Sequence, residues 1–353
     1  MAYPRLVSNM ESIKYNVREI SKMCHENGIE LVGVVKVAKG EPLLAKTYLE
    51  NGVDIIGDSR MQNIKRMRKD GVNGPFMLLR IPMMSEIEDV VESVDIVLVS
   101  ELETVKKIGE VATSRGKRQK IIYMVDIGDL REGVWFTKAV DEIVESSKIK
   151  GIDLYGIGTN LGCYGGVIPD PDNMRLLAKI GDKIRSQGVN FKVISGGNTA
   201  ALYMVKDKKI PPSINEYRLG ESLILGTDTT NNISFEFLKQ DTFTLEAEII
   251  ELKTKPSVPY GRIGRDAMGR VPVFEDLGDR LKAIIAIGEQ DIDPAGLIPL
   301  NKGIKVLHAS SDHTVLDVSD FDGNLKLGDI LKFRLTYSAL LRAMTSEYVE
   351  KVW

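Results

Sequence analysis

Eight short apolar segments recur along the first part of the chain, and helical patterns fill the gaps between them. Continuous apolar strands separated by helices are typical of a parallel sheet that is buried on both faces. Eight such strands favour a closed β/α barrel, and an open doubly wound sheet is the alternative. The segments are 31–35, 54–57, 76–81, 95–99, 121–126, 154–158, 191–195 and 216–219.

The pattern changes after about residue 225, where short strand-like runs are separated by turns and no long helix intervenes. Turn residues at Asp322-Gly323-Asn324 and at Asn301-Lys302-Gly303 favour antiparallel pairing of the neighbouring runs. This part of the chain therefore reads as an all-β domain. The runs are 243–251, 282–288, 303–308, 314–318 and 329–335.

The length supports the same division, because 353 residues exceed what one hydrophobic core usually organises. We predict an α/β fold, a (β/α)8 TIM barrel over residues 11–235, followed by a C-terminal all-β domain over residues 236–353. Residues 1–10 could add a strand to the second domain, and the polar segment 228–234 is the expected junction.

Composition excludes several classes of partner. A net charge of -3 with mixed acidic and basic residues gives no basic stripe for nucleic acid and no polybasic segment for a membrane. Residues 1–9 do not resemble a signal peptide, and no long apolar stretch follows, so we expect a cytoplasmic protein with a small soluble substrate. The two cysteines, Cys24 and Cys163, and the three histidines form no ligand pattern, so no metal site is expected.

Lys36 directly follows the first apolar segment and precedes a loop that opens a helix. Catalytic groups of β/α barrels lie on the loops after the carboxyl ends of the strands. A lysine amine at that place can hold a carbonyl cofactor as a Schiff base, although a lysine in this position is by itself more often a plain surface residue.

Polar loops follow three further strands. The first loop, Asp126 to Gly133, contains acidic residues, Arg131 and glycines. The second, Gly158 to Gly162, contains Asn160. Ser195 to Ala201 is rich in glycine and hydroxyl groups, and its backbone amides could bind a phosphate at a helix start. The eighth strand ends at Arg218-Leu219-Gly220-Glu221, which adds a cation at the same rim.

In this order, the segments resemble the alanine racemase superfamily of pyridoxal phosphate enzymes, which pair a β/α barrel with a C-terminal β domain. The resemblance covers nearly the whole chain and includes a catalytic tyrosine segment and a late phosphate-binding tyrosine. Within this superfamily, the sequences of four segments are most similar to the ornithine racemase branch. The matching segments are 34–36, 125–133, 197–201, 218–220, 258–262, 311–313 with Asp317, and Tyr337, and those of the branch are 79–83, 158–161, 255–259 and 309–313.

This resemblance implies pyridoxal 5'-phosphate as cofactor and a two-base mechanism. Lys36 would act on one face of the substrate, and Tyr260, supplied by the second subunit of a homodimer with shared sites, on the other. The substrate would contact Arg131, Ser311 and Asp312. The cofactor would contact Lys36, Arg131, Asn160, Asn198, Thr199, Arg218, Gly220, Glu221 and Tyr337.

Three departures from the alanine racemase pattern point away from alanine as substrate. Met124 stands where many alanine racemases carry a modified lysine, so Asp126 or Asp129 would have to orient the neighbouring arginine. The loop after Lys36 lacks a phosphate-binding tyrosine, and Lys39 could supply that contact. A neutral amide, Asn160, replaces a common histidine.

We therefore predict a racemase of a basic amino acid, with ornithine first and lysine or broad specificity as alternatives. The acids available for a distal ammonium are Glu221, Glu289, Asp291 and Asp312. A pyridoxal phosphate carrier of similar barrel type would have no β domain. A basic amino acid decarboxylase would be expected to show a glycine triplet in the phosphate loop and a late cysteine, whereas this chain has the doublet Gly196-Gly197 and no cysteine after Cys163.

Overall fold

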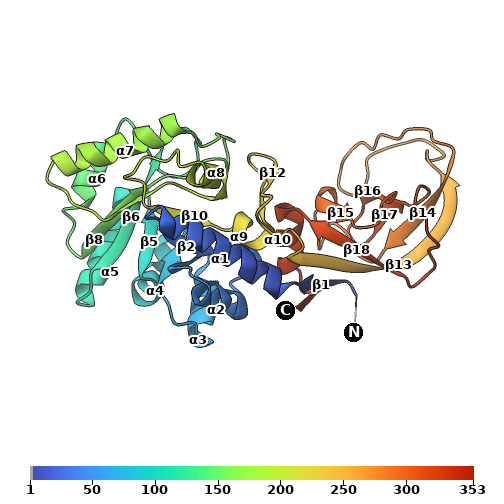
Figure 1. Cartoon of the computed structure of the whole chain (residues 1–353), viewed down its shortest axis with the longest axis horizontal. Helices are drawn as coiled ribbons and strands as arrows, with labels where there is room; N and C mark the ends of the chain where they lie inside the picture. Colours follow the sequence, from blue (N-terminus) through green and yellow to red (C-terminus); the bar gives the residue numbers. More distant parts are fainter. Residues whose placement is uncertain (1–2) are drawn as a thin grey trace. The chain divides into compact units, whose positions relative to one another are not determined.

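The computed structural model describes residues 3–353, which form two compact units (Figure 1). Residues 13–239 make one unit, and residues 240–353 with residues 3–12 make the other. None of the helices in the described residues is long and apolar enough to cross a membrane.

The first unit is built on a closed ring of eight parallel strands, which confirms the predicted barrel. The ring closes because β5 pairs with β6 as well as with β4, and a short strand, β7 (Val134–Trp135), adds to β6. The ring order is β2 (Glu30–Val34), β3 (Ile55–Asp58), β4 (Phe76–Leu78), β5 (Ile96–Val99), β6 (Gln119–Asp126), β8 (Ile152–Gly158), β9 (Val193–Ser195) and β10 (Glu216–Leu219).

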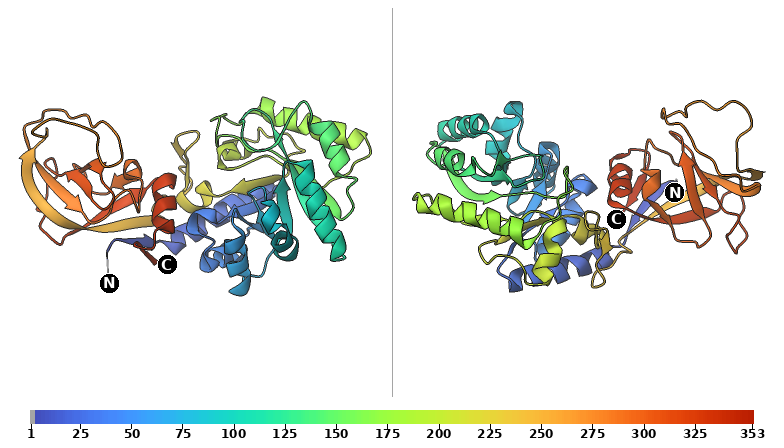
Figure 2. Two further views of the ribbon diagram at one scale, coloured as in Figure 1. Left: turned by 180° about the vertical axis from the view of Figure 1, so that it is seen from behind. Right: turned by 90° about the horizontal axis from the view of Figure 1, so that it is seen from above.

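Helices cover the outside of this ring, as the views in Figures 1 and 2 show. Their buried residues recur at helical spacing, as in α7, where Met174, Leu177, Ala178 and Ile184 are buried. The helices are α1 (Met10–Glu26), α2 (Pro42–Glu50), α3 (Met61–Lys69), α4 (Ile87–Ser93), α5 (Leu102–Ser114), α6 (Ala139–Ser146), α7 (Pro171–Ser186), α8 (Leu202–Lys206) and α9 (Glu221–Leu225).

Side chains fill the inside of the barrel, so that it is a packed core and not a channel. The close approach of β8 and β9 requires a glycine, because a Cβ at Gly156 would lie 2.5 Å from the carbonyl oxygen of Val193. The central cluster consists of Val32, Ile55, Met77, Ile96, Leu98, Ile122, Met124 and Val193.

Two segments of the barrel unit differ from the sequence prediction. β4 ends at Leu78, and Arg80 just beyond it pairs with Glu86, with its Nη2 2.6 Å from Oε1. The polar segment expected at the junction instead holds two short paired strands, β11 (Thr227–Asp228) and β12 (Ile233–Ser234), inside the barrel unit. The two units divide after Lys239.

The second unit is an antiparallel sheet to which the start of the chain contributes β1. β1 (Arg5–Ser8) pairs antiparallel with β13 (Phe243–Pro256) and parallel with β19 (Glu350–Val352). The remaining strands are β14 (Asp279–Ile285), β15 (Leu297–Pro299), β16 (Lys305–Ala309), β17 (Thr314–Asp317) and β18 (Ile330–Leu335).

One helix of the second unit, α10 (Tyr337–Thr345), is absent from the sequence prediction. Its buried residues Ala339, Leu340, Ala343 and Met344 follow a helical spacing that the sequence does contain. The helix is short and directly follows β18, which is why the alternating pattern of that strand hides it.

Candidate functional site

Lys36 begins the turn η1 (Lys36–Ala38) directly after β2, where the barrel strands end. Its side chain reaches solvent, yet the protein atoms around the amine reduce its hydration. This desolvation lowers the pKa of Lys36, and the charge of Arg131 lowers it further. Cys163, Asp58 and Glu132 act in the opposite direction. The amine is thus easier to deprotonate than that of an ordinary surface lysine.

Asp58 ends β3, on the strand next to Lys36, and its carboxylate is buried. Asn63 Nδ2 donates to both carboxylate oxygens at 3.0 and 3.2 Å, and the amide of Arg60 donates to Oδ1 at 2.8 Å. Burial raises the pKa of Asp58 to about 6, although these hydrogen bonds partly offset the rise.

Asn63 also connects Asp58 to the loop that follows Lys36. Arg66 Nη2 donates to Asn63 Oδ1 at 3.2 Å and to the backbone carbonyl of Lys39. Gly40 has a φ of 61° and packs so closely that a Cβ there would lie 2.7 Å from the Cβ of Asn63. The loop that carries Lys36 is therefore held by the neighbouring strand end and by α3.

The loop after β6 presents Arg131, which is paired with Glu132 rather than oriented by the two expected aspartates. Arg131 Nη2 donates to Glu132 Oε1 at 2.5 Å, and Nε donates to Oε2. Asp126 instead accepts hydrogen bonds from the backbone amides of Gly128, at 2.8 Å, and Leu130. The expectation that Asp126 or Asp129 holds Arg131 was wrong, because both carboxylates bind backbone amides.

Asp129 shapes a second loop of the rim, the segment after β8. Its buried carboxylate accepts from the amides of Gly162 at 3.0 Å, Cys163 at 3.1 Å and Tyr164 at 2.9 Å. A carboxylate with several amide donors is well stabilised, so Asp129 has a structural role in fixing Cys163 near the amine of Lys36.

Asn160 on this loop meets Asn198 of the loop after β9, and both side chains contact Cys163. Asn160 Nδ2 donates to the Cys163 sulfur at 2.9 Å, and Asn198 Nδ2 donates to Asn160 Oδ1 at 3.1 Å. Asn198 Oδ1 also caps the turn η3 (Thr199–Ala201) by accepting from the amide of Ala200 at 2.9 Å. The side chain of Asn198 thus organises two loops.

A pair of hydroxyl groups lies where the phosphate loop was expected. Thr199 Oγ1 is 3.2 Å from Ser222 Oγ, and the amide of Ser222 donates to Thr199 Oγ1 at 3.2 Å. Both side chains are buried. Ser222 was missed from the sequence, although a serine directly after Gly220 and Glu221, in the first turn of α9, is a signal that could have identified it.

Arg218 on β10 is 5% exposed and points into the barrel beside Ser195 of β9. Its Nη1 donates to Ser195 Oγ, and its Nη2 donates to the carbonyl of Thr159 at 2.6 Å. Burial lowers the pKa of Arg218, and the nearby Glu216 opposes that change. The guanidinium is held rigidly at the end of the barrel axis where the loops gather.

Gly220 and Glu221 follow Arg218, at the start of α9. Glu221 Oε1 accepts from Thr227 Oγ1 at 2.8 Å and Thr229 Oγ1 at 2.7 Å. Its carboxylate therefore supports the segment that contains β11.

Four predicted site residues belong to the second unit. Tyr260 lies in the long connection between β13 and β14, and its side chain is fully exposed, with a relative accessibility of 107%. Ser311 and Asp312 lie between β16 and β17, and Ser311 Oγ donates to Asp312 Oδ2 at 2.5 Å. Tyr337 is the first residue of α10 and is half-buried.

The other acids considered for a distal ammonium already have partners. Glu289 Oε1 accepts from Arg270 Nη2 at 2.6 Å, and Asp291 Oδ1 accepts from Ser346 Oγ at 2.6 Å. Asp317, part of the matched substrate-side segment, is buried and accepts from Arg280 Nε at 2.8 Å. Asp312 is exposed and bonded only to its own neighbour among the contacts of the described residues.

The donors at the barrel rim fit pyridoxal phosphate. The amine of Lys36 can bind an aldehyde carbon, the Thr199 and Ser222 hydroxyls can donate to a phosphate, and Arg218 offers a buried cation to a ring acceptor. No group of three acidic, cysteine or histidine side chains in residues 3–353 is arranged to hold a metal ion.

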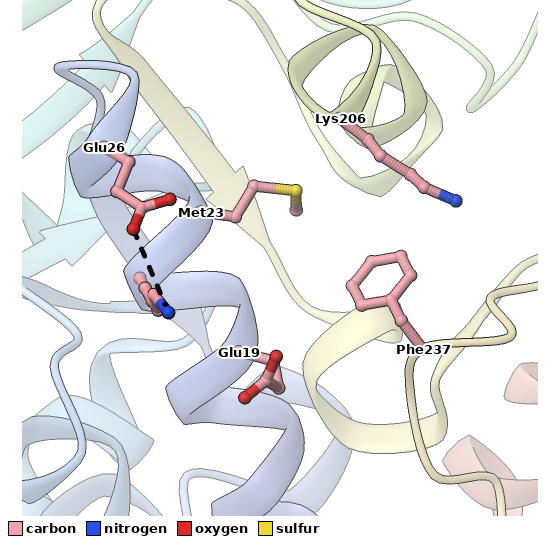
Figure 3. A pocket seen from close by; sticks show the side chains of 6 residues that line it. Glu19, Met23, Glu26, Lys206 and Phe237 are labelled. Carbon is pink, nitrogen blue, oxygen red and sulfur yellow. Dashed lines mark ion pairs between the residues drawn. The ribbon is translucent and has the colours of Figure 1, made fainter.

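A separate hollow of about 240 Å³ lies on the outside of the barrel unit (Figure 3). Glu19, Met23 and Glu26 of α1 face Lys206 and Phe237 across it, and Lys22 forms an ion pair with Glu26 at 4.0 Å. None of the predicted site residues lines this hollow.

Known proteins resemble this chain over its full length. The model of the family described as "Alanine racemase, N-terminal domain" matches residues 8–228. A lysine racemase of Thermotoga maritima is 51% identical and covers 100% of this chain and 99% of its own. An ornithine racemase of Acetoanaerobium sticklandii is 41% identical over 99% of both chains.

Solved structures show the same fold at low sequence identity. An alanine racemase of Clostridium difficile 630 superimposes with a TM-score of 0.77 at 22% identity, covering 99% of this chain and 96% of that one. An alanine racemase of Bartonella henselae, with covalently bound pyridoxal phosphate, has a TM-score of 0.76 at 17% identity, covering 100% of this chain and 99% of that one.

Proposed function

We propose, from the premise that the chain belongs to the alanine racemase family, that it is a pyridoxal-phosphate-dependent racemase of a basic amino acid. The observation that carries this proposal is the amine of Lys36, which lies at the barrel rim with a lowered pKa, among residues suited to the cofactor. The covalently bound cofactor in the Bartonella henselae relative supports the choice of cofactor.

When bound, the cofactor supplies an electron sink that makes the α-proton of an amino acid easier to remove. The amine of Lys36 must be unprotonated to accept that proton. Desolvation of the amine favours the unprotonated form. The contacts of Arg66 with Asn63 and with the carbonyl of Lys39 hold the backbone of the loop that carries Lys36.

Racemisation also needs an acid or base on the opposite face. We assign this role to Tyr260, whose phenol is fully exposed on its own chain and could enter the site of a second copy. This assignment requires a homodimer with shared sites. The exposed apolar residues of the same connection, Val271, Val273 and Phe274, support such an association.

Arg218 would contact the ring nitrogen of the cofactor and keep it unprotonated, because a guanidinium does not release its proton. Thr199, Ser222 and the backbone at Gly220 and Glu221 would hold the phosphate, together with Tyr337. Asn160 and Arg131 would bind the ring oxygen and the substrate carboxylate.

Lysine takes precedence over ornithine as the proposed substrate. The sequence segments favoured ornithine, whereas the lysine racemase is 51% identical to this chain and the ornithine racemase 41%. Asp312 is the candidate acceptor for the distal ammonium, because its carboxylate is exposed while that of Glu289 is ion-paired. The two substrates differ by one methylene, so activity on both is expected, within about 1–3 kcal/mol of discrimination.

Chiral chromatography of purified protein incubated with L-lysine, L-ornithine or L-alanine tests the proposal. Formation of D-lysine and D-ornithine, with little D-alanine, is expected, and a Lys36→Ala variant should form none. Absence of any D-enantiomer from a protein that binds the cofactor would contradict the racemase and favour a carrier, and release of carbon dioxide would favour a decarboxylase.

A further inference from the structure

Glu216 is a buried carboxylate that the proposed chemistry does not use. It lies on β10 two residues before Arg218, so the two side chains leave the same face of the strand. In the sheet register Arg218 lies opposite Val32, which belongs to the barrel core. Glu216 and Arg218 therefore both face the barrel interior, with Glu216 deeper along the axis.

The carboxylate of Glu216 lacks ordinary partners. Its side chain is 0% exposed, and neither oxygen accepts a well-formed hydrogen bond within residues 3–353, although the Ser195 hydroxyl lies close enough to favour its ionised form. Arg218 Nη1 is 4.0 Å from Glu216 Oε1 but donates to Ser195 Oγ instead. An ionised carboxylate in this environment is costly unless a nearby positive charge compensates it. Glu216 thus depends on Arg218 for its charged form.

The charged groups that face Glu216 come from three neighbouring elements. Arg218 on β10 and Lys192 before β9 favour its ionised form, Glu30 on β2 disfavours it, and the hydroxyl of Ser195 on β9 favours it. Lys192 is already engaged, since its Nζ donates to Glu30 Oε1 at 3.1 Å. Burial outweighs these effects and raises the pKa of Glu216 to about 7.

We propose, on the basis of the function proposed above, that Glu216 is a positioning residue that controls how strongly Arg218 donates to the ring nitrogen of the cofactor. With Glu216 ionised, the guanidinium shares its charge with the carboxylate. With Glu216 protonated, Arg218 has no counter-charge on that side and polarises its other acceptors more strongly. The electronic state of the bound ring should therefore change as Glu216 titrates.

The test is a pH titration of the absorbance of the cofactor-bound protein between about pH 5.5 and 8.5, which covers the expected change of charge. A spectral transition within about one pH unit of 7 is expected in the wild type and should be lost in Glu216→Gln. Glu30→Gln is the matched control, because Glu30 also faces the interior; it should keep the transition, with a lower midpoint because Glu30 disfavours the ionised form of Glu216. A wild type without a transition, or a Glu216→Gln variant that retains it, overturns the proposal.

A second variant covers the case in which Glu216→Gln does not fold. Glu216→Asp keeps the carboxyl group but moves it farther from Arg218, so the midpoint should shift, and an unchanged midpoint overturns the proposal. The spectral readout does not require turnover. A protein that binds cofactor without racemising contradicts the proposed function alone, whereas racemisation with an unaltered titration in Glu216→Gln contradicts the role of Glu216 alone.

Discussion

The burial of Asp58, at the strand end beside Lys36, allows a quantitative prediction of how the stability of the protein depends on pH. Burial raises its pKa from an ordinary 3.8 to about 6. Between these two values the folded state binds more protons than the unfolded state, so stability decreases as the pH rises through this window. A difference of about 2 pH units, at about 1.4 kcal/mol per unit, corresponds to about 3 kcal/mol lost by the time Asp58 is fully ionised.

Asp58→Asn removes this ionisation but keeps a side chain of the same size. Its amide oxygen can still accept from Asn63 and from the backbone amide of Arg60, as the carboxylate does. The variant should therefore gain stability relative to the wild type as the pH rises from about 4 to 7, by up to about 3 kcal/mol. The comparison at each pH cancels the titration of the other groups.

Urea unfolding of the cofactor-free protein across this pH range measures the difference directly. Asp89→Asn is the matched control, because Asp89 is a half-exposed carboxylate paired with Lys65 at 2.6 Å, and such surface pairs contribute little. A stability difference between Asp58→Asn and the wild type that does not change with pH would refute the reasoning. It would mean that Asp58 is not desolvated in the folded protein.

Two further predictions concern the Lys36 loop and the shared site. Gly40→Ala should lower the free energy of unfolding by about 1–3 kcal/mol and weaken the absorbance of the bound cofactor, because residue 40 has a φ of 61° and no room beside Asn63. A variant whose unfolding free energy and cofactor absorbance both equal those of the wild type would contradict this prediction. Mixing inactive Lys36→Ala with inactive Tyr260→Phe should restore racemisation, because a mixed dimer would contain one intact site; a mixture that stays inactive after subunit exchange would contradict a Tyr260 that acts across subunits.

The sequence predicted the barrel because its signal is local. Most of the strands are largely apolar runs, and each predicted run overlaps a strand of the ring. The polar residues at the strand ends could likewise be identified one loop at a time, since Lys36 and Arg218 directly follow or end their strands. Helix α10 was missed because its nine residues follow a strand without a clear break.

The contacts between these loops could not be predicted in the same way. Asp58 lies just after the predicted strand 54–57 and was not identified from the sequence, because its burial depends on Gly40 and Asn63 folding over it. Glu216 and Ser195 become neighbours only through the register of β9 and β10. The pairing of Arg131 with Glu132 rather than Asp129 depends on where the segment after β8 places its amides.

The central claim is that Lys36 removes and returns the α-proton of a basic amino acid. Incubation of L-lysine with the cofactor-bound protein in deuterated water, followed by mass spectrometry of each enantiomer, tests it most directly. The D-lysine formed by the wild type and by Lys69→Ala, a variant of an exposed lysine at the end of α3, should carry deuterium at the α-carbon, and Lys36→Ala should give none. Deuterated D-lysine from Lys36→Ala, or no exchange by a wild type that binds the cofactor, would contradict the account.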